Sequence, residues 1–151
     1  MFTVLITTLL IAMVPVLELR GAIPIGVSLG LHPIVATFVA IIGNFLPILP
    51  ILLLLTKIFD FLRERKFSKK FIAKLEERVE KKRDVVDKYG WLGLIILVAI
   101  PLPGTGAWTG ALVAGVLEMK TKTAALAIAA GILIAGLVVS LVTFGAVSIF
   151  S

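Results

Sequence analysis

The chain has 151 residues, of which 60% are hydrophobic, and its mean hydropathy is +1.14. Soluble domains have an apolar share of about 45–50%, so the composition predicts an integral membrane protein with a single domain. The absence of cysteine excludes disulfides, thiol catalysis and cysteine-based metal sites, and one histidine leaves no histidine cluster for a metal. We therefore expect neither a metal nor another cofactor.

The net charge of +6 belongs to one segment. Residues 57–88 hold 12 of the 15 Lys and Arg residues and 7 of the 9 Asp and Glu residues. Loops rich in Lys and Arg stay in the cytoplasm, so this segment is a topology signal. We expect a multi-pass protein of the cell membrane with residues 57–88 in the cytoplasm and both termini outside. No base-reading motif accompanies the charge, which argues against nucleic-acid binding.

The first apolar segments are too short to span a bilayer. Residues 1–17 extend about 25 Å as a helix and residues 21–31 about 16 Å, whereas the hydrocarbon core is about 30 Å thick. We predict that they form a re-entrant hairpin, which enters and leaves the membrane on one side. Residues 34–56 contain no charge and are long enough to span the membrane, and Asn44, Pro47 and Pro50 together predict a kink near their middle.

Residues 57–88 are predicted to form an amphipathic helical connector. Apolar residues recur there at every fourth position, on one face of a helix: Phe67, Phe71, Leu75 and Val79. A single helix of this length would extend about 48 Å, so we predict two helices separated near residues 66–68. The apolar face either binds anionic headgroups or a partner helix, or rests on the protein itself or on the membrane surface.

Residues 89–117 are also free of charge, but prolines and glycines interrupt them between Pro101 and Gly110. Two prolines and three glycines in ten residues are incompatible with the interior of a regular helix. We predict a second re-entrant hairpin, made of residues 89–100 and 106–117 and entered from the cytoplasm. Residues 123–150 form a second long span, whose Ala and Gly residues suit close helix packing.

Residues 1–56 and 89–151 share one order of elements: short helix, Pro/Gly break, short helix, long span. Four identities recur at an offset of 85 positions: Leu17 and Leu102, Gly21 and Gly106, Ala22 and Ala107, Gly30 and Gly115. Because the two hairpins are expected to enter from opposite sides, the sequence predicts an all-α inverted repeat. Such repeats bind their substrate where the broken segments meet near the midplane of the bilayer.

Glu18 and Arg20 are the charged residues of the first predicted hairpin. A charge at bilayer depth costs about 2.5–3.5 kcal/mol, so an ionisable residue there usually serves a function. The nearby Gly21 and Pro24 favour partly extended backbone, in which side chains two residues apart share a side. Our hypothesis is that Arg20 holds an anionic or phosphate group while Glu18 exchanges protons. The structural alternative is an ion pair that closes the tip, or charges that reach headgroup water.

Further candidates for substrate or ion binding are Gly21 and Pro24 of the first break, Asn44, and six residues of the second break: Pro103, Gly104, Thr105, Gly106, Trp108 and Thr109. Asn44 needs a hydrogen-bond partner in the membrane, on another helix or on the substrate. The helix that begins near Gly106 would turn its positive end towards the site and favour an anion, although close packing between the hairpins also explains the glycines. Trp108 either stacks on a cationic or ring-bearing substrate or packs at an interface.

Two segments carry a resemblance to a known family: Glu18-Leu-Arg20-Gly21-Ala-Ile-Pro24-Ile-Gly26 and Pro101-Leu-Pro103-Gly104-Thr-Gly106-Ala-Trp108-Thr-Gly110. They resemble the putative small multidrug export protein family, which is in turn similar to the DedA/VTT membrane proteins. The resemblance covers nearly the whole chain except the charged segment, and it implies membrane transport. DedA-like proteins use acids and arginines within the membrane. At the offset of 85, Pro103 and Thr105 stand where Glu18 and Arg20 stand, which argues against a mechanism that needs arginines from both halves.

Three functions are therefore weighed. The first is a transporter of small amphipathic substrates, with proton coupling as an added hypothesis. The second is a DedA-like flippase or scramblase for phosphate-bearing lipids, such as polyprenyl phosphates or phospholipids, and the third is a non-transporting membrane scaffold. Glu18 with Trp108 suits a cationic substrate, whereas Arg20 with the glycine-rich helix end suits a phosphate. An enzyme is not expected, because no nucleophile, base and orienting group occur together. Two long spans form a thin wall around a site, so we expect a homodimer.

Overall fold

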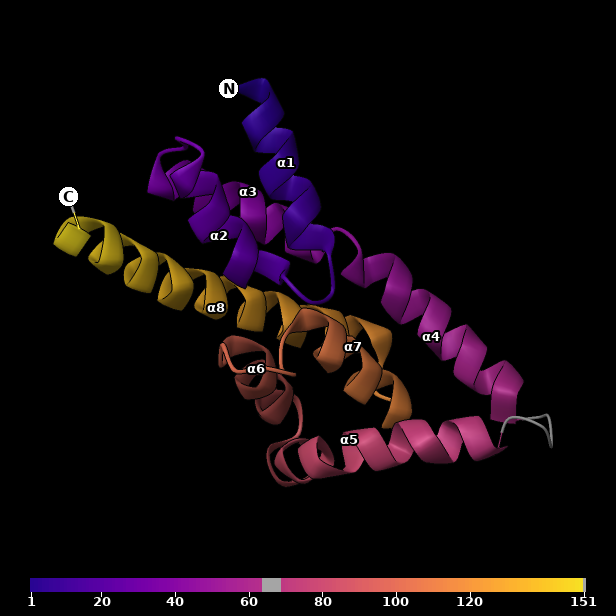
Figure 1. The fold of residues 1–151 in the computed structure, drawn as a ribbon. Helices are drawn as coiled ribbons and strands as arrows, with labels where there is room; N and C mark the ends of the chain where they lie inside the picture. Colours follow the sequence, from indigo (N-terminus) through magenta and orange to yellow (C-terminus); the bar gives the residue numbers. More distant parts are fainter. Residues whose placement is uncertain (64–68, 151) are drawn as a thin grey trace.

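The computed structural model describes residues 1–63 and 69–150, and all of the regular secondary structure there is helical. The helices in chain order are α1 (Phe2–Met13), α2 (Glu18–Ser28), α3 (Pro33–Phe45), α4 (Ile48–Arg63), α5 (Lys69–Tyr89), α6 (Trp91–Ala99), α7 (Ala107–Val116) and α8 (Thr121–Phe150). The long helix α8 crosses the middle of the molecule, with α1 to α3 on one side and α5 to α7 on the other (Figure 1). The predicted all-α fold is confirmed for these residues.

Two stretches are long and apolar enough to cross a membrane. They are Pro33–Phe61, which comprises α3 and most of α4, and Thr121–Ile149 within α8. Large apolar side chains along both are exposed, among them Phe38, Leu53 and Leu141. Such surfaces are unfavourable in water and favourable against lipid. Together with the composition, they indicate a membrane protein.

The breaks in the helices lie close to the predicted positions. Helix α3 ends at Phe45 and α4 begins at Ile48, so the break near the middle of residues 34–56 is confirmed and lies at Pro47. Proline has no N–H to donate to the carbonyl group four residues earlier, which favours an interruption at this point. The bounds of α6 and α7 lie within two residues of the predicted segments 89–100 and 106–117.

In both halves of the chain, a glycine brings a short helix into contact with a long one. A Cβ atom on Gly43 of α3 would lie 2.5 Å from the carbonyl oxygen of Leu9 on α1. A Cβ atom on Gly131 of α8 would lie 3.0 Å from the carbonyl oxygen of Ile95 on α6. The backbones touch at these positions, as expected for helices that pack closely in a membrane.

The turn between α2 and α3 has the same hydrogen bonds as the turn between α7 and α8. Each turn contains two backbone bonds: Gly30 to Val27 and Leu31 to Gly26 in the first, Glu118 to Gly115 and Met119 to Ala114 in the second. Gly30 and Glu118 both have a left-handed backbone, with φ of 96° and 54°. They are 88 positions apart, so the predicted offset of 85 is wrong for these turns, although the repeated turn itself favours an internal repeat.

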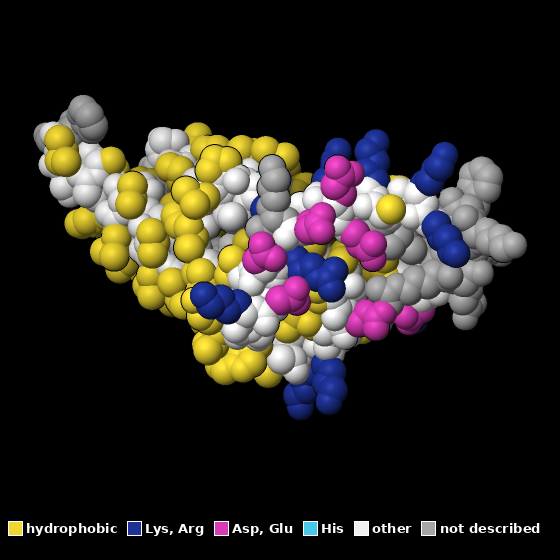
Figure 2. All heavy atoms as spheres, turned by 90° about the horizontal axis from the view of Figure 1, so that it is seen from below, with side chains coloured by type: hydrophobic (Ala, Val, Ile, Leu, Met, Phe, Trp, Pro, Cys, Tyr) yellow, Lys and Arg dark blue, Asp and Glu magenta, His cyan; other side chains and the backbone are white. Residues whose placement is uncertain are grey.

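Part of the charged connector, helix α5, contributes side chains to the hydrophobic core. Val79 and Val86 of α5 are only 5% and 4% exposed and belong to the core on the side where α5 packs against α6 and α7, whereas Phe71 remains 57% exposed. Towards its C-terminal end, the apolar face of the connector therefore rests on the protein itself. The predicted break near residues 66–68 lies outside the described residues, as does Phe67. Figure 2 shows charged side chains of both signs gathered over the face formed by α5, with hydrophobic side chains over much of the remaining surface.

Gly43→Ala tests the contact between α1 and α3. A glycine-to-alanine change inside a helix normally stabilises it by about 1 kcal/mol. At Gly43 the added methyl group would push the carbonyl group of Leu9 away, so we expect thermal melting in detergent to show a loss of about 1–3 kcal/mol. The control is Gly145→Ala in α8, where a methyl group meets no atom within 4 Å and should not lower the stability. Equal melting temperatures for the two variants would contradict this packing.

Candidate functional site

The hairpin α1–α2 meets the hairpin α6–α7 at the loop of residues 100–106, which we call the second tip. Arg20 donates hydrogen bonds to the carbonyl oxygens of Leu102, at 2.5 Å, and Ile100, at 3.4 Å. It also donates to the hydroxyl group of Thr105 at 2.9 Å. Because α6 ends at Ala99, these acceptors directly follow a helix C-terminus, where a positive charge is favourable. Arg20 therefore caps the end of α6.

Glu18 binds the start of the next helix. Its side chain is only 4% exposed, and its Oε1 atom accepts the backbone N–H of Trp108 at 3.2 Å. The backbone N–H of Ala107 also interacts with this carboxyl group. Because α7 begins at Ala107, Glu18 supplies a negative charge to a helix N-terminus. The anion that the sequence predicts at the start of α7 is thus a carboxyl group of the chain itself.

Glu18 and Arg20 do not bind each other. Their charges interact, but neither accepts or donates a hydrogen bond to the other, since Glu18 accepts from Trp108 and Arg20 donates to Leu102, Ile100 and Thr105. The prediction of partly extended backbone is wrong here, because α2 already begins at Glu18 and contains Gly21 and Pro24. Glu18 itself has a left-handed backbone with φ of 47°, and its side chain binds the start of α7 while that of Arg20 binds the loop after α6. The predicted ion pair within the first hairpin is therefore replaced by two contacts between hairpins.

Two buried polar atoms have no hydrogen-bond partner among the residues described: Asn44 Oδ1 and Trp108 Nε1. The side chain of Asn44 is 1% exposed and interacts with the carboxyl group of Glu18, so this residue links α3 to α2. An amide side chain can donate through its nitrogen to a carboxylate or accept through its oxygen from a carboxylic acid. Asn44 can therefore support Glu18 in either protonation state.

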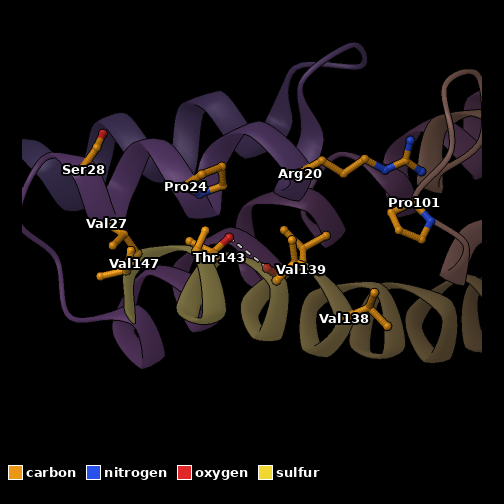
Figure 3. A pocket seen from close by; sticks show the side chains of 11 residues that line it. Arg20, Pro24, Val27, Ser28, Pro101, Val138, Val139, Thr143 and Val147 are labelled. Carbon is orange, nitrogen blue, oxygen red and sulfur yellow. Dashed lines mark hydrogen bonds between the residues drawn. The ribbon is translucent and has the colours of Figure 1, made fainter. Parts of the chain in front are cut away.

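A groove of about 740 Å³ lies between α2 and the C-terminal half of α8 (Figure 3). Its lining comprises Arg20, Pro24, Val27 and Ser28 of α2, Pro101 of the second tip, and Val138, Val139, Val142, Thr143, Ala146 and Val147 of α8. Arg20 is the charged residue of this lining and extends towards Pro101 at one end of the groove. The hydroxyl group of Thr143 donates to the carbonyl oxygen of Val139 in its own helix, at 2.8 Å. The groove is thus mainly apolar with one cationic end.

The family model described as "Putative small multi-drug export protein" matches residues 18–138. The chain belongs to this family. The match runs from the start of α2 at Glu18 to Val138 in α8, and it includes the second tip and the connector. It confirms the resemblance that the two motifs indicated, and it makes a coarse transporter-like function the expectation for the chain. No curated protein and no solved structure matched the chain.

In this member of the small multidrug export family, the predicted site residues form two groups and some outliers. The first group surrounds the carboxyl group of Glu18 and comprises Glu18, Asn44, Gly106 and Trp108. The second group is Arg20 with Thr105. Pro24 lines the groove. The remaining predicted residues have local roles: Gly21 packs against the side chain of Leu17, Thr109 donates to the carbonyl oxygen of Gly104 at 3.2 Å, and Pro103 and Gly104 are exposed on the second tip.

Sequence reasoning missed Lys82 and the α8 wall of the groove. The ammonium nitrogen of Lys82 lies 3.3 Å from where a Cβ atom on Gly104 would stand, so α5 reaches the second tip. Burial and the nearby positive charge of Arg20 lower the pKa of Lys82 from its usual value. Lys82 stands within the charged run of residues 80–84, and nothing in that run distinguishes it.

Gly106→Ala tests the contact between Glu18 and α7. Gly106 has a φ of 119°, and a Cβ atom there would lie 2.2 Å from Oε2 of Glu18. We expect a loss of about 2–4 kcal/mol in thermal stability, from backbone strain and from displacement of the carboxyl group, and faster hydrogen exchange at the first turn of α7. The control is Gly30→Ala, which has the same kind of strain at a φ of 96° but meets no atom within 4 Å. Equal losses in the two variants would count against the contact.

Proposed function

We propose that the protein exports small amphipathic molecules across the membrane and that the groove between α2 and α8 is its substrate site. The observation that carries this proposal is the groove itself, with its apolar walls and the guanidinium group of Arg20 at one end. Its volume of about 740 Å³ lies within the range of about 300–1,000 Å³ that is usual for sites of drug-sized ligands. Membership of the export family supports the coarse function.

The position of the groove also suits transport. Arg20 belongs both to the groove and to the contact between the hairpins, so the groove begins where two broken helical segments meet. Transporters built from inverted repeats bind their substrates at such places. The repeated turns and the repeated glycine contacts favour an internal repeat. Insertion of the two halves in opposite directions would then place the groove near the midplane of the bilayer.

The charged connector favours loading from the cytoplasm. The positive-inside rule places α5 on the cytoplasmic side, and Lys82 of α5 lies next to the second tip. The polar end of the groove is therefore within reach of the cytoplasm, while the groove continues along α8 away from the tip. A substrate that binds from this side would leave on the other, which is the direction that export requires.

Glu18 is the residue through which we propose that protons drive this cycle. As a carboxylate it accepts the N–H groups that begin α7, and it thereby holds the two hairpins together. A proton on Glu18 removes the negative charge from the helix terminus and weakens this contact. Asn44 can then accept the new O–H group. Protonation of Glu18 would thus loosen the tips at the stage when the groove has to open.

One observation favours a second candidate, the movement of phosphate-bearing lipids. Val142 and Val147, which line the groove, are 68% and 42% exposed, so the groove is open along a surface that faces lipid if α8 spans the membrane. A lipid chain could enter such a groove sideways while its headgroup stays near Arg20. We infer this candidate from the open groove and from the resemblance to DedA-like proteins that the sequence motifs suggested.

Ala146→Trp tests the groove. The indole ring would occupy the space between α8 and α2, so we expect at least a tenfold slower efflux of an amphipathic dye from liposomes that contain the purified protein. Leu141→Trp is the matched control, because Leu141 is on the same helix, is 73% exposed and does not line the groove. Scrambling of a fluorescent phosphate-headgroup lipid is measured in the same liposomes. If Ala146→Trp blocks only scrambling, the lipid candidate replaces the exporter, and unchanged efflux in that variant would refute the site.

Glu18→Gln tests the coupling to protons. The amide oxygen of Gln can still accept the N–H of Trp108, so the protein should fold, but the residue no longer takes up a proton. We expect dye efflux from the liposomes to become independent of an imposed pH gradient, whereas the wild-type rate changes with that gradient. Glu80→Gln removes one exposed acid of α5 and should leave the response unchanged. A Glu18→Gln protein that responds to the gradient like wild type would exclude this residue as the proton carrier.

A further inference from the structure

Two cationic side chains converge on the second tip from helices that are far apart in the chain. Arg20 of α2 reaches it with hydrogen bonds to Leu102, Ile100 and Thr105. Lys82 of α5 reaches it from the other side, where its ammonium group lies beside Gly104. The two positive charges are close enough to repel each other, and this repulsion, together with burial, lowers the pKa of Lys82.

Neither Arg20 nor Lys82 forms a hydrogen-bonded ion pair with a carboxylate whose side chain the structure describes. Glu18, the acid closest to Arg20 in sequence, is directed to the start of α7. Two cations that lie near each other and are partly withdrawn from water are unfavourable, and an anion between them would relieve their repulsion.

The cations also retain hydrogen-bond donors for such an anion. A guanidinium group has five N–H donors, and Arg20 makes three hydrogen bonds to the protein. An ammonium group has three donors, and Lys82 makes no hydrogen bond to any residue that the structure describes. Phosphate and carboxylate groups are the acceptors that bind such donors most strongly.

We propose that Arg20, Lys82 and the second tip form a binding site for the anionic headgroup of an amphipathic molecule, whose apolar part occupies the groove. This inference rests on the proposed function, because it takes the groove as the substrate site, and it names the substrate class as amphipathic anions with a phosphate or carboxylate group. The same two charges disfavour a cationic amphiphile. The site makes Lys82 of the charged connector a direct ligand of the substrate.

The test uses purified full-length protein in an uncharged detergent and measures binding by calorimetry with three probes: dodecyl phosphate, dodecyltrimethylammonium and inorganic phosphate. We expect dodecyl phosphate to bind at least about tenfold more tightly than either of the other probes, since charged hydrogen bonds and the apolar groove both contribute. Lys82→Gln should weaken its binding about tenfold, and Lys82→Arg should retain it. Lys74→Gln is the matched control, because Lys74 is an exposed residue of the same helix.

A melting curve without ligand accompanies each variant. Lys82→Gln removes one of two repelling charges, so it should melt no lower than wild type, and a loss of binding in a folded variant then reports on the site. Unchanged affinity in Lys82→Gln, or equal affinity for dodecyl phosphate and dodecyltrimethylammonium, would overturn the proposal. If inorganic phosphate binds as tightly as dodecyl phosphate, the apolar part of the ligand contributes nothing. The proposal of an amphipathic ligand is then refuted, and the site is assigned to free phosphate.

The two proposals fail in different experiments. If dodecyl phosphate binds through Lys82 but the protein has no efflux activity, the proposal of an exporter is refuted and the anion site stands. If Ala146→Trp blocks efflux, Lys82→Gln does not affect it and only cationic dyes are transported, the anion site is refuted and the proposal of an exporter stands.

Discussion

The structure depends on the charged side chains of Glu18 and Arg20 at the start of α2. Glu18 binds the first turn of α7, and Arg20 binds the carbonyl groups that follow α6. The loop of residues 100–106 presents carbonyl groups directly after α6, and the first N–H groups of α7 have no partners within the helix. Arg20 donates to the former and Glu18 accepts from the latter, each with the sign that the helix dipole favours. This explains how an acid and a base are tolerated in an apolar segment: a charge at bilayer depth is costly alone but not when it satisfies backbone groups that have no water to bind.

The same arrangement separates the two residues in function. The carboxyl group of Glu18 is enclosed by α7 and Asn44, where a proton can reach it but a bulky substrate would have to displace the helix. Arg20 lines the groove and is also near Lys82, so its charge acts on whatever occupies that end. A cationic drug pairing with Glu18 and Trp108, as the sequence indicated, would find the carboxyl group already occupied. The proposed anion site would instead take molecules whose polar end is negative.

The sequence predicted the features that depend on local chemistry. Prolines and glycines in the second break placed the ends of α6 and α7 within two residues, and Pro47 placed the kink between α3 and α4. Prediction failed where contacts between distant segments decide. Gly21 and Pro24 indicated extended backbone, but the first turn of α2 is helical because its side chains are bound at both sides of the second tip. Lys82 could not be found, because its role arises only from the packing of α5 against α6 and α7.

The glycine contacts have a mechanical consequence. A Cβ atom on Gly93 of α6 would lie 2.3 Å from the carbonyl oxygen of Val85 on α5, and one on Gly131 of α8 would lie 2.6 Å from the Cβ atom of Val98 on α6. Helices in such close contact cannot slide past one another without separating, so α5, α6 and α8 form a rigid block. Gly43 joins α3 to α1 in the same way. Any motion that widens the groove is then a displacement of the block of α5, α6 and α8 against the block of α1 and α3. The hydrogen bonds of Glu18 and Arg20 would oppose such a displacement.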